Sequence, residues 1–286
     1  MSSPGTTGLV KQNRFSKCLD QGLAVLRCFT PERPVLGIAD IAAELDMGRS
    51  NVHRYAITLV ALGYLEQGAS RKYQLGGRGV DVGMAMLRAT GLRAASREHL
   101  ELLRASTGYS VGIGLLDRTE ALYADRLASH RRGQALGGPR IGAGVRVPVY
   151  CTSIGKALLA SASAEVRESV LREGHRRRRT SYTITKKAHL RVQLDAIAER
   201  GFAVVDQEFH LGLRSLAVPV RDATEVVAAV NLSVYQADVE VDELIESFYP
   251  LVGATAEKVS LALGYAAGES RVAADVATDL ADRGEP

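Results

Sequence analysis

The chain has 286 residues, an apolar content of 46% and a formal net charge of +4, a length that holds about two domains of ordinary size. It contains no run of about 18 apolar residues and no basic segment followed by an apolar one at its start, so we expect neither a membrane span nor a secretory signal. Cys18, Cys28 and Cys151 show no paired spacing, which favours a reducing, cytoplasmic compartment.

The first 14 residues are rich in Ser, Gly and Thr, and we expect residues 1–14 to form a disordered tail. Ser16 is a suitable N-cap for a first helix over residues 17–29. The apolar spacing predicts that this helix turns Leu19, Leu23, Leu26 and Phe29 toward the core.

Residues 15–76 carry the pattern of a winged helix-turn-helix. A short helix with apolar residues at helical spacing is followed by a polar turn centred on Gly48, a second helix over 50–62, and a hairpin over 64–75. The apolar residues expected in the core are Ile38, Ile41, Ala42 and Leu45 on the first of these helices and Val52, Ala56, Leu59 and Leu62 on the second. The second helix of such a pair enters the major groove of DNA.

Polar and basic side chains occupy the opposite face of that second helix. The candidate DNA contacts are Arg49, Ser50, Asn51, His53, Arg54 and Thr58, with Arg71 and Lys72 on the wing. Arg pairs bidentately with guanine and Asn with adenine, whereas hydroxyls meet phosphates. The alternative is that these residues are solvated side chains without a partner. Residues 1–90 hold eleven Lys and Arg against seven Asp and Glu, which accounts for the whole positive excess and favours nucleic-acid binding.

A linker helix is expected within residues 77–91. Its apolar side chains are Val80, Val82, Met84 and Leu87, more than a small wing can cover. An uncovered apolar face indicates a partner surface, so we expect a homodimer or homotetramer, and a two-fold dimer matches a two-fold operator.

Residues 92–265 are expected to form an α+β domain with a mixed or antiparallel sheet, of a size that holds a small-molecule site. Helices are predicted over 92–106, 154–162, 165–173, 190–200 and 242–263, and strands over 111–116, 120–125, 144–150, 201–206, 214–220 and 226–234. Residues 266–286 are expected to be a flexible tail.

Three ordered blocks of sequence resemble the IclR-type family of bacterial transcription regulators. They are the helix-turn-helix region, the Val147–Ala160 stretch with its Gly-Lys-Ala, and the Gly201–Val220 stretch with its Glu…Gly…Ala-x-Pro pattern. Within the third block, the segments Asp-Gln-Glu and Gly-Leu-Arg-Ser are most similar to the sequences of one branch of the family. That branch, the PcaR, PcaU and PobR type, controls aromatic-acid catabolism. The resemblance implies a GAF-like effector domain, a dimer or tetramer, and a DNA-binding regulator rather than an enzyme.

The resemblance also implies a set of effector-binding positions. They fall on Cys151, Ser153, Ile154, Ser215, Asn231 and Ser233. The residues give independent support, because the free amides at the start of a helix near Ile154 can hold a carboxylate. Polar residues on otherwise apolar strands also need partners. We therefore expect a small organic acid, more narrowly an aromatic acid, as the effector, and no cofactor. The alternatives are that Thr152 or Ser153 only caps the helix and that the strand residues bond to backbone.

Two chemical alternatives remain open on sequence. Ser153 and Lys156 match the Ser-x-x-Lys nucleophile motif, so the chain is alternatively a hydrolase fused to a DNA-binding module; this requires a base within reach of Ser153. His210 near Glu208 is a weak candidate for a metal site.

Overall fold

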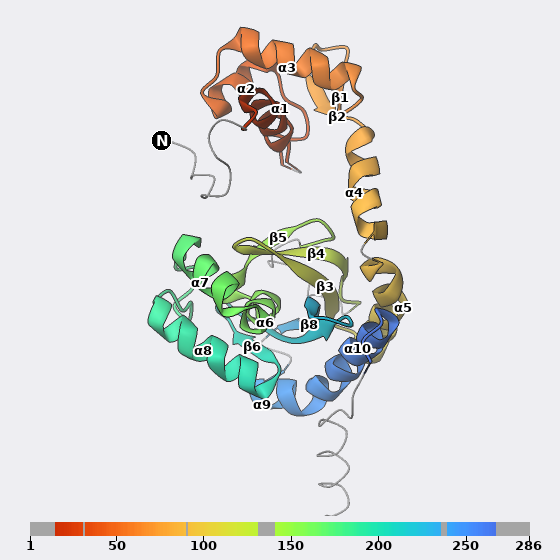
Figure 1. The fold of residues 1–286 in the computed structure, drawn as a ribbon, viewed down its shortest axis with the longest axis vertical. Helices are drawn as coiled ribbons and strands as arrows, with labels where there is room; N and C mark the ends of the chain where they lie inside the picture. Colours follow the sequence, from red (N-terminus) through yellow and green to blue (C-terminus); the bar gives the residue numbers. More distant parts are fainter. Residues whose placement is uncertain (1–14, 31, 90, 131–140, 236–238, 267–286) are drawn as a thin grey trace, which may run out of the picture. The chain divides into compact units, whose positions relative to one another are not determined.

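The computed structural model describes residues 15–30, 32–89, 91–130, 141–235 and 239–266 (Figure 1). The chain forms two compact units, Met1–Ala89 and Thr90–Pro286. Tails are expected over 1–14 and 266–286; residues 1–14 and 267–286 lie outside the described residues.

The N-terminal unit contains three helices, a two-stranded hairpin and a fourth helix. They are α1 (Lys17–Arg27), α2 (Ile38–Leu45), α3 (Arg49–Ala61), β1 (Leu65–Gln67), β2 (Tyr73–Leu75) and α4 (Arg78–Ala89). The two strands pair antiparallel, with Leu65 opposite Leu75. This element order is that of a winged helix-turn-helix, which confirms the fold expected from the sequence.

The core of this unit corrects two sequence expectations. Val25 and Cys28 of the α1 region are buried, whereas Leu19 and Leu23 are 63% and 47% exposed, so the prediction was wrong for these two leucines. Leu26 and Phe29 lie in or against the core, as expected. Leu62 is also exposed, because α3 ends at Ala61 and Leu62 caps it. The remaining predicted apolar residues of α2 and α3 lie in or against the core cluster.

The C-terminal unit is built on one six-stranded sheet with the order β5-β4-β3-β8-β7-β6. The strands are β3 (Ser110–Asp117), β4 (Glu120–Leu127), β5 (Arg146–Pro148), β6 (Ala203–Asp206), β7 (Leu213–Arg221) and β8 (Val226–Tyr235). Every neighbouring pair is antiparallel, so the unit is α+β with an antiparallel sheet.

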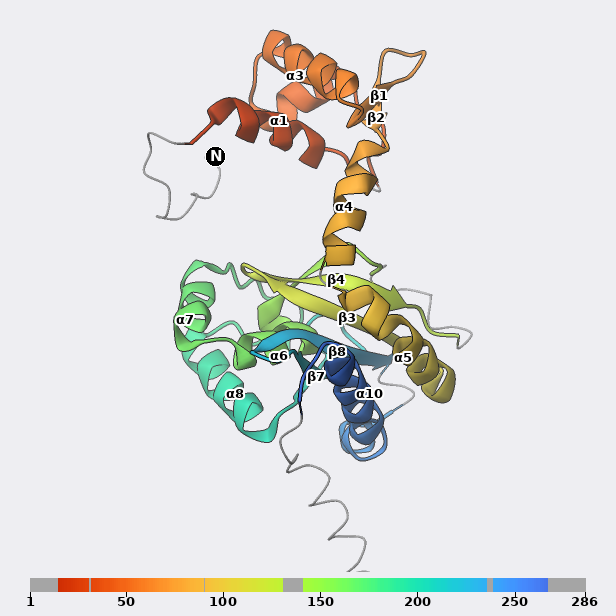
Figure 2. The ribbon, with the colours of Figure 1, turned by 45° about the vertical axis from the view of Figure 1, so that its right-hand side comes forward.

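Helices cover both faces of this sheet (Figure 2). One face packs against α5 (Leu92–Thr107) and α10 (Tyr249–Ala262), and the other against α6 (Ser153–Ser161), which α8 (Lys187–Arg200) covers in turn. The short α7 (Ala164–Glu173) packs beside α6. The α6 face of the sheet is where small residues let a helix approach closely.

Two predicted elements differ from those observed. The strand expected over 144–150 is only β5, because a 3-10 turn, η2 (Val149–Cys151), leads directly into α6. The long closing helix begins as α9 (Val241–Glu243) and passes through a π-helical turn, η3 (Leu244–Phe248), ahead of Pro250 in α10. Within the described ranges, no helix combines the length and apolarity needed to cross a bilayer.

Candidate functional site

Helix α3 presents a row of polar side chains to solvent. Arg49, Ser50, Asn51, His53, Arg54 and Thr58 are all exposed. Arg54 donates to Asn51 Oδ1 at 3.5 Å and lies over the Tyr55 ring, while the Thr58 hydroxyl donates back to the Arg54 carbonyl at 2.9 Å. The opposite side of α3 is fixed in the core by Val52 and Ala56, both fully buried.

The wing places its basic residues at the hairpin tip. Arg71 and Lys72 are exposed, and Arg71 has a positive φ of 55°. Arg71 N donates to Gly68 O at 3.1 Å, which closes the turn. Exposed cations on a short hairpin next to α3 can reach a phosphate backbone.

A second candidate site lies on the α6 face of the sheet in the C-terminal unit. Ser215 pairs with Ser233 and Ala217 with Asn231, so these four residues share one face. Ala203, Ala217 and Ala229 belong to the core cluster that includes α6. The expected polar residues of β7 and β8 are therefore brought together beneath α6, and Cys151 and Ile154 are buried in the same cluster.

Two glycines allow close packing around α6: Gly155 against the turn η2, and Gly114 of the sheet against Ile154 of α6. A Cβ on Gly155 would lie 2.3 Å from Val149 Cα, and a Cβ on Gly114 would lie 2.9 Å from Ile154 Cδ1. Thr152 caps α6, because its hydroxyl accepts from Gly155 N at 3.3 Å and donates to Pro148 O at 2.7 Å. The capping role considered for Thr152 or Ser153 thus belongs to Thr152, which leaves Ser153 without it.

Two buried polar atoms at this site have no hydrogen-bond partner among the described residues: Ser153 Oγ and Asn231 Oδ1. Both residues are only 1% exposed. Asn231 uses its nitrogen to donate to Ser233 Oγ at 3.1 Å. A buried polar atom without a partner costs free energy, so Ser153 Oγ and Asn231 Oδ1 each call for a partner that the described residues do not supply.

Sequence reasoning did not find Tyr123 and Arg126 of β4. Arg126 pairs with Gly112 of β3, and Gly112 pairs with Asn231 of β8, so the three share one face. Arg126 Nη1 donates to the Tyr123 hydroxyl at 3.3 Å. Burial raises the pKa of Tyr123, and Arg126 and Asn231 partly offset this by favouring its charged form.

The thiol of Cys151 is buried directly before α6. Burial raises its pKa to about 12; the positive charge of Arg179 opposes the rise and the negative charge of Glu208 adds to it. A thiol of this kind stays protonated at neutral pH and acts as a small apolar side chain.

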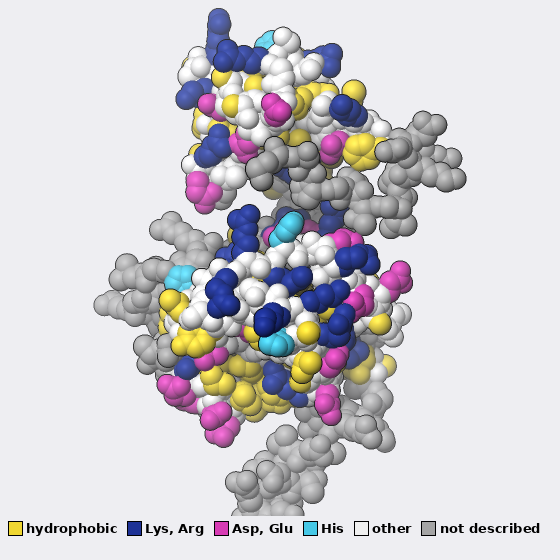
Figure 3. Space-filling model, turned by 90° about the vertical axis from the view of Figure 1, so that its left-hand side faces the viewer, with side chains coloured by type: hydrophobic (Ala, Val, Ile, Leu, Met, Phe, Trp, Pro, Cys, Tyr) yellow, Lys and Arg dark blue, Asp and Glu magenta, His cyan; other side chains and the backbone are white. Residues whose placement is uncertain are grey.

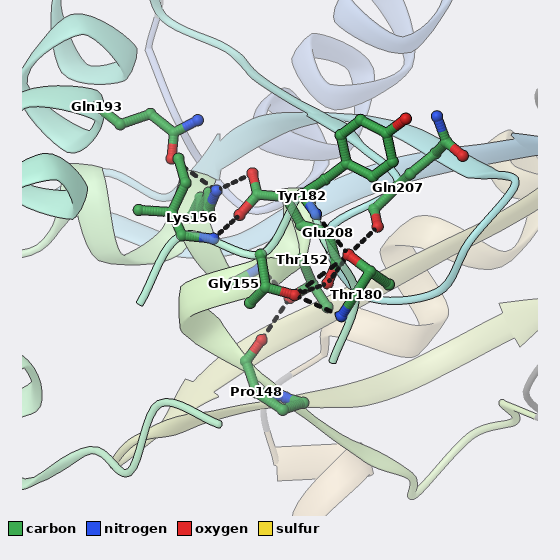
Figure 4. Close-up of polar contacts among 11 residues, drawn as sticks. Pro148, Thr152, Gly155, Lys156, Thr180, Tyr182, Gln193, Gln207 and Glu208 are labelled. Carbon is green, nitrogen blue, oxygen red and sulfur yellow. Dashed lines mark hydrogen bonds and ion pairs between the residues drawn. The ribbon is translucent and has the colours of Figure 1, made fainter. Parts of the chain in front are cut away.

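A polar cluster lies one turn further along α6 (Figure 4). Lys156, fully buried, donates to Glu208 and to Gln193 Oε1, the latter at 2.6 Å. Glu208 Oε2 accepts from Ile184 N at 3.3 Å, and its carbonyl accepts from the Thr183 hydroxyl at 2.7 Å. This cluster ties the segment before α8 to the β6–β7 connection and to α6.

The chemical alternatives find no support in this geometry. Lys156 is engaged by Glu208 and Gln193, and Ser153 Oγ has no base as a partner in the described part of the chain. His210 Nδ1 lies 2.8 Å from Leu211 O, and the described residues contain no group of three side chains able to hold a metal.

Lys and Arg side chains gather on the face of the C-terminal unit that carries α7 and α8 (Figure 3). The basic run 176–179 lies in the connection between α7 and α8. Arg176 donates to three carbonyl oxygens, those of Leu171, Gly174 and Thr185, and Arg179 lies over the Phe209 ring at 4.7 Å. Part of this run is therefore structural.

Comparison with known proteins assigns a family to both units. The IclR helix-turn-helix domain family matches residues 18–69, and the family described as bacterial transcriptional regulator IclR C-terminal matches residues 84–261. The Pca regulon regulatory protein of Pseudomonas putida is 32% identical over 239 residues, 83% of this chain and 81% of its own length.

Solved structures agree with this assignment. A transcriptional regulator from Rhodococcus sp. RHA1 is 31% identical and superimposes with a TM-score of 0.74 over 87% of this chain and 98% of its own. A double mutant of the PobR inducer-binding domain from Acinetobacter, in complex with 3-hydroxybenzoic acid, is 30% identical with a TM-score of 0.53 over 59% of this chain and 97% of its own. The relatives are transcriptional regulators, so the hydrolase alternative is set aside.

Proposed function

The chain belongs to the IclR family of bacterial transcriptional regulators, and we propose that its C-terminal unit senses a small aromatic acid bound between the start of α6 and the polar face of β7 and β8. The residues of this site are those expected from the sequence: Cys151, Ser153, Ile154, Ser215, Asn231 and Ser233. In the N-terminal unit, α3 reads the operator and the wing contacts its backbone.

The observation that carries the effector site is the pair of buried, unpartnered polar atoms, Ser153 Oγ and Asn231 Oδ1. They come from different elements, α6 and β8, that pack together. A ligand that supplies hydrogen bonds to both removes the free-energy cost of burying them. The acidic character follows from the first amides of α6, which carry partial positive charge next to Ser153.

The aromatic character rests on relatedness. The PobR domain described above binds 3-hydroxybenzoic acid, and its sequence is similar to that of this C-terminal unit. The apolar side chains around the site, such as Ile154 and the ring of Tyr123, suit a flat ring.

Replacing Ser153 with Leu tests the effector site. The larger apolar side chain fills the start of α6, so we expect the variant to bind operator normally and to lose its response to 3-hydroxybenzoate in a titration of operator affinity. Ser161→Leu, at the other end of α6, is the matched control and should keep the response. A normal response of Ser153→Leu would place the effector elsewhere.

Two arginines test the DNA contacts. Arg54→Ala should cost roughly 1–3 kcal/mol of binding to the specific operator and little on random duplex, because it removes a base contact. Arg71→Ala should weaken binding to both duplexes by the same factor and reduce the salt dependence of the affinity. Equal losses on both duplexes for Arg54→Ala would remove its base-reading role.

We propose that the regulator binds DNA as a homodimer. Exposed apolar side chains support this: Val80 and Val82 on α4 are 64% and 58% exposed, Leu19 and Leu23 lie one turn apart on α1, and the exposed Phe15 comes just before the N-cap of that helix. Met84 and Leu87, the other expected members of the α4 face, lie outside the described side chains. Sedimentation should give a dimer or tetramer at micromolar concentration, and a monomer that binds one whole operator tightly would contradict the proposal.

A further inference from the structure

The connection between α7 and α8, together with the first half of α8, carries charge of one sign. Residues 174–194 hold seven Lys and Arg and no Asp or Glu. The other residues of 91–286 hold eighteen Lys and Arg against twenty-five Asp and Glu. A strongly basic segment therefore lies within an otherwise acidic unit, and the face that carries α7 and α8 is rich in Lys and Arg (Figure 3).

The backbone of this connection is held in place by hydrogen bonds. Arg176 donates to carbonyl oxygens at both ends of the connection, including that of Thr185 at 3.3 Å. The Tyr150 hydroxyl donates to the carbonyl of Arg177 at 2.8 Å. Cations on a backbone that is already ordered lose less conformational entropy on binding than cations on a flexible segment.

Among the described residues, Arg177, Arg178 and Lys186 are exposed and have no carboxylate partner. The carboxylates of the neighbouring helix α7 are engaged elsewhere: Glu168 pairs with two cations of α8, and Glu173 with another arginine of α7. We call the three unpaired cations the basic surface. Their charge is available to an anionic partner.

The side chains around the basic surface favour phosphates over a protein partner. The large apolar side chains exposed in residues 174–194 are those of Tyr182 and Val192, whereas protein interfaces are centred on a cluster of apolar and aromatic anchors. Exposed hydroxyls of Ser181 and Tyr182 lie between the arginines and Lys186 in the chain. Arg, Lys and hydroxyl side chains are the groups that contact phosphate oxygens in DNA complexes.

Double-stranded DNA is the polyanion that this regulator meets. The C-terminal unit is covalently joined to the DNA-binding unit, so its own contacts with the same DNA form at a high effective concentration. Contacts that are weak in isolation then add to the affinity of the whole chain.

We propose that Arg177, Arg178 and Lys186 bind the phosphate backbone of double-stranded DNA, independently of its sequence. The C-terminal unit then contributes to DNA affinity in addition to α3 and the wing. The contribution is electrostatic and depends on salt, because each phosphate that the protein neutralises releases condensed counterions. It does not depend on which residues of α3 read bases, since a duplex of random sequence is enough to test it.

The test is a fluorescence anisotropy titration of a long duplex of random sequence with the full-length protein at several salt concentrations. Combining Arg177→Gln with Arg178→Gln should lower the slope of log affinity against log salt by about two and the affinity at about 0.1 M salt by at least about tenfold. Arg177→Lys with Arg178→Lys keeps both charges and should keep most of the slope. Lys186→Gln alone should lower the slope by about one, which covers the case in which the Gln pair does not fold.

The matched control combines Arg221→Gln with Lys258→Gln. These cations of β7 and α10 are also exposed, and the control removes the same net charge, so its slope should equal that of the wild type. An unchanged slope in the Gln pair at 177 and 178, or an equal fall in the control, would overturn the proposal. If Arg71→Ala lowers the slope and the Gln pair does not, the wing contact stands and this proposal alone fails.

Sedimentation of the same variants without DNA distinguishes the remaining occupant, a second copy of the chain. The Gln pair should sediment as the wild type does. A shift to a smaller species would show that the basic surface joins copies of the protein, and would overturn its assignment to DNA.

Discussion

Two groups of buried polar residues include residues of α6 that lie one helical turn apart, Lys156 and Ser153. They differ in how many of their polar atoms have hydrogen-bond partners. The Lys156–Glu208 cluster is closed: the lysine has two acceptors and the carboxylate has the lysine and a backbone amide. The site around Ser153 and Asn231 is open, with one buried atom on each residue lacking a partner in the described structure. The first arrangement ties α6 to two other segments of the unit, and the second is the site that we propose for the effector.

The difference shows that burial of polar groups has two opposite uses in one small region. A satisfied buried network specifies one packing of its surroundings, whereas an unsatisfied one stores a cost that binding removes. The same substitution strategy should therefore give opposite results at the two places, and the following experiments test this.

The largest effect is expected for Lys156→Met. It leaves the Glu208 carboxylate, whose side chain is 6% exposed, buried without its cation. We expect the C-terminal unit to lose about 3–5 kcal/mol of unfolding free energy in urea denaturation.

The control for this variant is Arg191→Met, which breaks the exposed pair with Glu168 and should leave the unfolding free energy nearly unchanged, because water screens an exposed pair. Adding Glu208→Gln to Lys156→Met should recover part of the loss. A small loss for Lys156→Met alone would mean that the cluster does not stabilise the unit.

A smaller effect with the opposite sign is expected at the open site. Ser153→Ala removes a buried hydroxyl without a partner, so the unfolding free energy should stay unchanged or rise by up to about 1 kcal/mol. The neighbouring Thr152→Ala removes the cap of α6 and should lower it by about 1 kcal/mol. Thermal unfolding of the two variants in parallel decides, and equal destabilisation would show that Ser153 is already satisfied.

The smallest effect concerns reactivity alone. Cys151 is fully buried in the core cluster that includes α6, and burial raises its pKa to about 12, so at pH 8 the thiol is almost entirely protonated and reacts slowly. In the native protein a disulfide reagent should modify the exposed Cys18 first, and Cys151 only after urea is added. Cys18→Ser identifies the fast thiol by its loss. Rapid modification of Cys151 would show that the start of α6 opens locally.

Much of the fold followed from the sequence because periodicity reports which face of an element is apolar. It located α2, α3 and the wing, and the polar residues of β7 and β8 were placed on one face because alternation is uninterrupted there. Periodicity failed at α1, because this helix has apolar residues on two of its sides. Packing against α2 and α3 buries Val25 and Cys28 and leaves Leu19 and Leu23 exposed.

The part of the site on β4 was missed for a different reason. The pairing of β3 with β4 shifts between Ile113 and Gly114, which leaves Ala124 as an extra residue. Simple alternation from Tyr123 would put Asp125 on the α6 face, whereas the bulge puts Arg126 there. Nothing in the local sequence marks the bulge, since it is fixed by pairing with a distant strand. The contacts proposed for DNA and effector remain predictions.

The bulge also limits which sequence changes β4 can tolerate. Because Asp125 and Arg126 serve opposite faces, a single-residue insertion or deletion in β4 would exchange them. It would deprive Arg93 and Arg97 of α5 of their carboxylate and bury a charge against the wrong helix. Point substitutions at Arg126 keep the frame intact. A substitution at Arg126 therefore changes the α6 face alone, whereas a change in the length of β4 alters both faces of the sheet at once.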